Sequence, residues 1–98
     1  MTTVPKQIEI GGSKIHVVVE PMEEWGAYCH DTSTITLSPK TIAKKSSLRE
    51  TLRHEMLHAS LQISGVGFME RYDEEPIVRC MDGVFWPAWE RVRKRLNI

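Results

Sequence analysis

The sequence predicts an α+β fold in which a small antiparallel N-terminal sheet packs on two helices. Up to residue 38, apolar residues alternate with polar ones, as in strands that bury one face. Beyond that point they recur every three or four residues, as in amphipathic helices. A length of 98 residues leaves room for one hydrophobic core, so we expect a single domain over residues 1–98.

Two hairpins should form the sheet. Ile8 and Ile10 belong to a first strand, Gly11 and Gly12 suit a tight turn, and alternation resumes over residues 15–19. Residues 25–30 and 34–37 then flank a short polar turn at residues 31–33, which predicts the second hairpin.

A long helix should follow, because Ser47 and Glu50 fit a capping box and Gly65 with Gly67 supply a stop. Plotted at 100° per residue, its apolar side chains share one broad face: Leu48, Leu52, Met56, Ala59 and Ile63. A narrow polar stripe remains for solvent: Arg49, Arg53 and Ser60.

A last helical stretch is predicted after Asp73, with Pro87 kinking or restarting it. Apolar residues mark its buried face: Val78, Met81, Phe85, Trp89, Val92 and Leu96. The basic cluster near its end, from Arg91 to Arg95, is typical of a solvated helix terminus.

The charge balance argues against polyanionic partners. Thirteen basic and thirteen acidic residues give a formal charge of zero, so no global field attracts nucleic acid or an anionic membrane. No apolar run approaches the ~20 residues that cross a bilayer. Met1 is followed by polar residues rather than a signal peptide, so we expect a cytoplasmic protein.

The long helix contains His54-Glu55-Met56-Leu57-His58, an HExxH motif. Imidazoles four residues apart project from neighbouring turns, with Cβ atoms ~5–6 Å apart, and both reach one zinc ion. Glu55 lies beside that metal position, where it can accept a proton from a zinc-activated water. Since His54 and His58 fall almost opposite the stripe of Arg49 and Arg53, we expect them to point into the protein.

A catalytic zinc site needs a third protein ligand. No histidine follows His58, which leaves the acidic run Asp73-Glu74-Glu75. Either glutamate fits, and we favour Glu75; the other is then only favourable charge at a helix N-terminus. Cys29 is a weaker alternative, because Cys29 and Cys80 form no CxxC pair and are typical of free thiols.

The HExxH motif followed by Glu74-Glu75-Pro76-Ile77-Val78-Arg79 resembles the small zinc metallopeptidases of bacteriophages and prophages, which are similar in plan to the ImmA/IrrE peptidases. The resemblance covers most of the chain. It implies a zincin-like domain with a gluzincin-like ligand set of His54, His58 and a glutamate, with Glu55 as general base. It also implies a Zn²⁺ cofactor, a peptide or protein substrate and, for a phage-encoded protein, a bacterial host cell.

The predicted function is therefore zinc-dependent hydrolysis of peptide bonds. The alternative is a zinc-bound regulatory or protein-binding module without turnover.

For an extended substrate, residues 34–37 are the predicted sheet edge. Four residues could stabilise an oxyanion: Tyr28, His30, Tyr72 and Arg79. The three tryptophans, Trp25, Trp86 and Trp89, should pack the core or shield the cleft.

The choice of third ligand predicts a difference between two isosteric variants. Glu75→Gln should lower the zinc bound per chain, whereas Glu74→Gln should retain it, because a neutral amide is a poor substitute for a carboxylate ligand. Zinc stoichiometry of the two purified proteins decides between them, and the reverse result would assign the ligand to Glu74.

Overall fold

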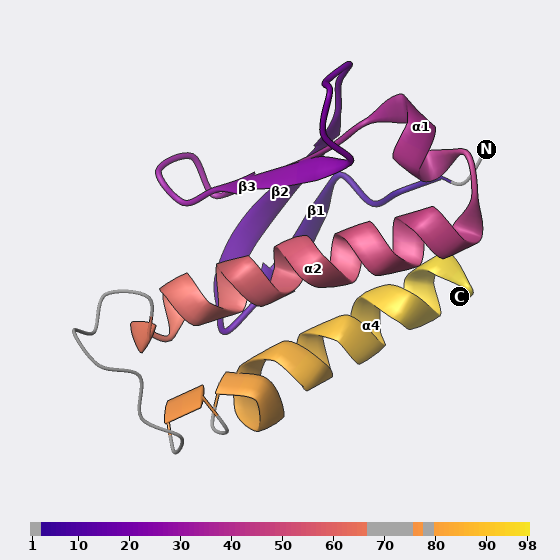
Figure 1. The fold of residues 1–98 in the computed structure, drawn as a ribbon. Coiled ribbons are helices and arrows are strands. Elements are labelled where there is room, and N and C mark those ends of the chain that lie inside the picture. The colour runs from indigo at the N-terminus through magenta and orange to yellow at the C-terminus, as the bar shows by residue number, and fades with distance from the viewer. Residues whose placement is uncertain (1–2, 67–75, 78–79) are drawn as a thin grey trace.

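The computed structural model describes residues 3–66, 76–77 and 80–98, with the backbone alone of Asp82. A four-stranded sheet lies over two long helices that run side by side (Figure 1). In chain order the elements are β1 (Gln7–Ile10), β2 (Ser13–Val19), β3 (Gly26–Cys29), β4 (Thr34–Leu37), α1 (Pro39–Ile42), α2 (Lys45–Ile63), a π-helix η2 (Met81–Phe85) and α4 (Trp86–Leu96). The α+β class is confirmed.

Both predicted hairpins are present, but they join in a way the sequence did not predict. β1 pairs with β2 and β3 with β4, both antiparallel, whereas β2 and β4 are parallel neighbours. The strand order is therefore β1-β2-β4-β3, and the sheet is mixed rather than antiparallel throughout. The connection over residues 20–25 is long enough to cross two strand spacings, about 10 Å, which leaves a position for β4.

This order corrects the predicted edge. β4, at residues 34–37, is an interior strand paired on both sides, and β3 forms the edge of the sheet on that side. The two strands differ in what they bury: Ile35 and Leu37 of β4 are fully buried, whereas no residue of β3 is buried.

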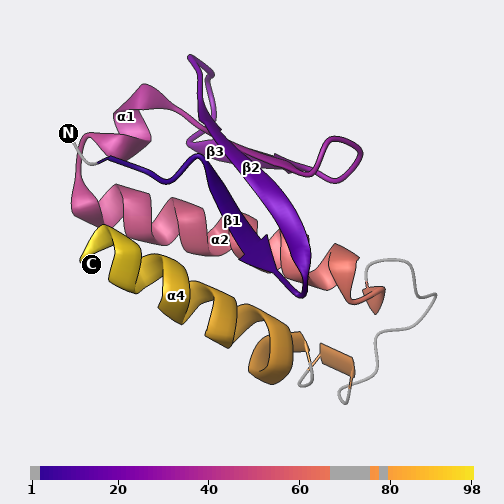
Figure 2. The ribbon, with the colours of Figure 1, turned by 180° about the vertical axis from the view of Figure 1, so that it is seen from behind.

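The core lies between one face of the sheet and the helices. Apolar side chains of the strands and helices meet there: Ile8, Ile10, Ile15, Val17, Ile35, Leu37, Leu48, Leu52, Met56, Ala59, Phe85, Trp89, Val92 and Leu96. Seen from behind, the described helices leave the other face of the sheet uncovered (Figure 2). None of the described helices combines the length and apolar character that crossing a bilayer requires.

The long helix starts two residues before its predicted first residue. α2 begins at Lys45, and the Ser47 hydroxyl donates to the carbonyls of Thr41 and Lys44 instead of capping a helix amide. The prediction of a capping box was therefore wrong. The short helix α1, which begins at Pro39, brings the carbonyl of Thr41 within hydrogen-bonding distance of the Ser47 hydroxyl. The predicted stop at Gly65 is confirmed, since this residue adopts a φ of +85° just after the helix; Gly67 lies outside the described residues.

The C-terminal helix restarts at Pro87, as predicted. Pro87 lies in the first turn of α4, and the backbone at Phe85 and Trp86 before it is already helical. The preceding π-helix η2 was not predicted. Pro76, Ile77 and Cys80 are helical, but the predicted helix start after Asp73, and with it Glu74 and Glu75, lies outside the described residues.

The C-terminal arginines bind the sheet edge opposite β3. Arg91 donates to the carbonyl of Glu9 at 3.0 Å, and Arg95 donates to that of Gln7 at 3.4 Å. Arg93 instead forms an ion pair with Glu90. The side chains of Arg91 and Arg95 thus occupy acceptors that an unpaired edge strand would otherwise present to another chain.

Close packing between β3 and α2 depends on Gly26. A Cβ atom at this position would lie 2.7 Å from the Thr51 methyl group and 3.1 Å from the Thr36 carbonyl oxygen. Gly26→Ala should therefore destabilise the protein by about 1–3 kcal/mol, as overpacked positions do. Thr51→Ser in the same chain should recover most of that loss, because it removes the methyl group. Urea unfolding of the three variants measures both effects.

Gly83→Ala is the matched control, because a Cβ there meets no atom within 4 Å. It should leave the free energy of unfolding unchanged or raise it. Equal stability of Gly26→Ala and the wild-type protein would contradict the close approach of β3 to α2.

Candidate metal centre

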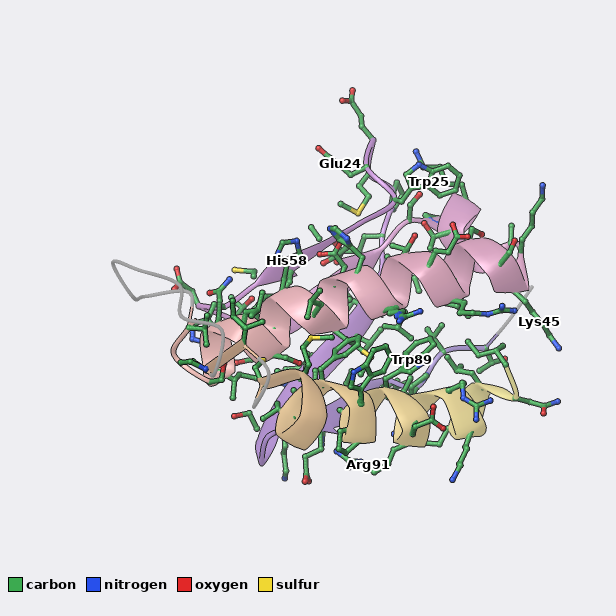
Figure 3. The ribbon with its side chains drawn as sticks, turned by 60° about the horizontal axis from the view of Figure 1, so that its bottom comes forward. Glu24, Trp25, Lys45, His58, Trp89 and Arg91 are labelled. Atoms are coloured by element: carbon green, nitrogen blue, oxygen red, sulfur yellow. The ribbon has the colours of Figure 1, made fainter. Side chains whose placement is uncertain are left out.

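The two histidines of the HExxH motif lie together on the surface of α2. Their Nε2 atoms are 3.1 Å apart, and the rings meet edge to face with centroids separated by 4.7 Å. Both residues are exposed. Figure 3 shows His58 on the opposite side of α2 from α4 and Trp89.

The separation of these nitrogens fits a shared metal ion. Two zinc–nitrogen bonds of ~2.0–2.1 Å at a tetrahedral angle place their nitrogens about 3.3 Å apart. The observed 3.1 Å is within a few tenths of an ångström of that value. Small ring rotations would therefore bring His54 and His58 onto one zinc ion.

The exposure of His54 and His58 corrects the prediction that they point into the protein. Arg49 and Arg53 are exposed as predicted, and the Arg53 guanidinium lies 4.7 Å from the centre of the Trp86 ring. The exposed part of α2 is wider than the predicted stripe, because it also includes His54 and His58. Ser60, predicted to be in the polar stripe, is fully buried and donates its hydroxyl hydrogen to the Met56 carbonyl.

Glu55 occupies a different environment from its neighbours. It is buried, with 6% of its surface exposed, although His54 directly before it is exposed. It nevertheless lines the same pocket as His54. A carboxylate in this position is sheltered from bulk solvent but open to the space beside the histidines.

This pocket has a volume of about 430 Å³ and lies between the start of β3 and the first half of α2. Its lining residues are Trp25, Gly26, Ser47, Glu50, Thr51, His54 and Glu55. Trp25 and His58 lie on the same side of α2 (Figure 3).

Sequence analysis did not predict Ser47, Glu50 or Thr51 as pocket residues. Thr51, Glu50 and Ser47 precede His54 by three, four and seven residues, and this spacing was the available signal, since it places them on the helix side that bears His54.

The predicted third ligand, Glu75, and its alternative Glu74 lie outside the described residues. Within the described part of the chain, no three His, Cys, Asp or Glu side chains form a metal-binding group. Cys29 therefore does not join the two histidines. It is exposed at the end of β3, where a hydrogen bond from the Thr32 hydroxyl lowers the pKa of its thiol.

Two of the predicted oxyanion donors interact with each other. The Tyr28 hydroxyl lies 2.8 Å from Nδ1 of His30, within hydrogen-bonding distance. Burial, together with the neighbouring Cys29, raises the pKa of the Tyr28 phenol, so it stays protonated at neutral pH. The other two, Tyr72 and Arg79, lie outside the described residues.

The tryptophans divide between the two predicted roles. Trp89 is buried in the core, whereas Trp25 is 53% exposed and lines the pocket. Trp86 is half-buried below Arg53.

Comparison with known proteins gives no match: no family model, curated protein or solved structure aligns significantly with this chain.

Removal of one imidazole should abolish tight metal binding if the pair forms a site. Loss of a residue that only hydrogen-bonds to a zinc ligand lowers zinc affinity by roughly 10–100-fold. His54→Ala removes a ligand itself, so it should lower zinc affinity by more than that. His16→Ala is the control, because His16 is an exposed histidine on β2. Competition with a chromophoric chelator measures both affinities, and equal zinc affinity of the two variants would contradict the site.

Proposed function

We propose that the protein is a zinc-dependent metallopeptidase, with His54 and His58 as zinc ligands and Glu55 as the general base. The observation that carries the proposal is the 3.1 Å separation of the two Nε2 atoms, with Glu55 lining the adjoining pocket. Neutral imidazoles provide the nitrogen donors that zinc prefers, and a nearby carboxylate provides the base that hydrolysis requires.

A zinc ion held there would supply Lewis-acid polarisation of a peptide carbonyl and of the attacking water. Glu55 would accept the proton of that water and deliver it to the amine that leaves. Its burial suits this work, because a sheltered carboxylate is not surrounded by competing solvent. We assign the role of third zinc ligand to Glu75, the glutamate directly before Pro76.

An extended peptide would reach this pocket along β3. In the described part of the chain β3 pairs only with β4, so its outer edge has free backbone donors and acceptors. A peptide added along this edge would run beside the pocket that Gly26, Thr51 and Glu55 line. The substrate class we propose is therefore an extended peptide or an unfolded protein segment.

The decisive variant is Glu55→Gln, which keeps the shape of the side chain and removes its basicity. Zinc should remain bound, while hydrolysis of a peptide or denatured-protein library should fall by about 10²–10⁴-fold, the usual contribution of a general base. Metal content and product formation are measured on the same preparations. Glu9→Gln, an exposed glutamate on β1, is the matched control and should retain full activity.

Two results would contradict the mechanism. Equal activity of Glu55→Gln and the wild-type protein would remove Glu55 from the reaction. Zinc binding without hydrolysis in either form would favour the alternative function, a zinc-bound regulatory or protein-binding module.

A further inference from the structure

The pocket beside His54 combines an aromatic wall with negative charge. Trp25 is the most exposed of the large apolar residues in the described chain, and it lines the pocket together with Glu50 and Glu55. The hydroxyl-bearing Ser47 and Thr51 complete the polar part of the lining. No lysine or arginine is among the lining residues of the described chain. This combination favours a cation over an anion or a purely apolar group.

Trp25 already interacts with one cation. The Lys40 ammonium lies 4.9 Å from the centre of the indole ring and donates a hydrogen bond to the carbonyl of Glu23. Lys40 is not among the lining residues of the pocket. The Trp25 carbonyl accepts hydrogen bonds from the Ser38 amide and the Thr41 hydroxyl, which fixes the backbone that carries the ring.

The pocket also has the right reach. Glu50 precedes His54 by four residues, which is one helical turn or about 6 Å along α2. An extended lysine side chain has five bonds of about 1.5 Å between Cα and Nζ and spans about 6 Å. A side chain that reaches Glu50 therefore leaves its own backbone close to His54 and Glu55.

We propose that this pocket is a specificity site for a basic side chain, lysine or arginine, of a bound peptide. The charged end lies between the Trp25 ring and the Glu50 carboxylate, and the adjoining peptide bond lies beside His54 and Glu55. The inference rests on the proposed function for its cleavage step, but selective binding of the basic side chain needs no catalysis.

The test compares three hexapeptides that differ only at a central residue: lysine, norleucine or glutamate. Binding to the full-length wild-type protein is measured by isothermal titration calorimetry in the presence of a chelator, so that no zinc-dependent cleavage occurs. The lysine peptide should bind about five- to tenfold more tightly than the norleucine peptide, and the glutamate peptide should bind most weakly. Raising the salt concentration should reduce this preference.

Two variants locate the preference in the pocket. Glu50→Gln and Trp25→Leu should each reduce the preference for lysine over norleucine about threefold. Glu9→Gln should leave this preference unchanged, because Glu9 lies on β1, at the edge of the sheet opposite β3. Circular dichroism checks that each variant is folded; Glu50 and Trp25 are both exposed, so neither change disturbs the core.

Norleucine binding as tightly as lysine, an unchanged preference in Glu50→Gln, or no binding of any peptide up to millimolar concentration would each overturn the proposal. Hydrolysis is measured separately after zinc is added back. A lysine preference in binding without any hydrolysis would support this specificity site while removing the proposed peptidase activity.

Discussion

The burial of α2 along one face is the constraint on which the site depends. Leu48, Leu52, Met56 and Ala59 pack between the sheet and α4, and their burial fixes the rotation of the helix about its axis. With that rotation, His54 and His58 are exposed, while Glu55 is buried and lines a pocket together with Gly26 of β3. The division between two exposed imidazoles and one sheltered carboxylate is thus a consequence of core packing.

The two edges of the sheet are treated differently, and this asymmetry determines where another chain can pair. β1 is covered by arginines of α4, whose guanidinium groups occupy the carbonyls of Gln7 and Glu9. β3, at the other edge, instead contacts α2 through Gly26 and Thr51. A strand added to the sheet would meet less competition at β3, and β3 is the edge that adjoins the pocket.

The sequence predicted those features that depend on local periodicity. Alternation placed Ile8 and Ile10 on one face of a strand, and both are buried; the four-residue spacing of His54 and His58 was enough to predict that the rings meet. In both cases the deciding geometry lies within a single element, so no knowledge of distant contacts was needed.

Features that depend on contacts between distant segments were predicted wrongly or not at all. The position of β4 inside the sheet is decided by how residues 20–25 cross it, and no turn motif marks that connection. The exposure of His54 depends on which sides of α2 the sheet and α4 cover, and the helix sequence alone does not determine this. Ser47 likewise fits a capping box by local pattern, but it bonds to the carbonyl of Thr41 in the preceding helix.

The relation between metal and fold follows from where the histidines lie. Structural zinc sites are commonly closed by four Cys or His ligands and supply much of the folding free energy of the small domains that contain them. Here the hydrophobic core includes strands and helices from both halves of the chain, and neither His54 nor His58 belongs to it. A zinc ion at this pair would therefore bind outside the hydrophobic core that the described residues form. The binding energy of that zinc ion would not be needed to fold the chain. It would be available to orient a ligand in the pocket, as a catalytic site requires and a structural site does not.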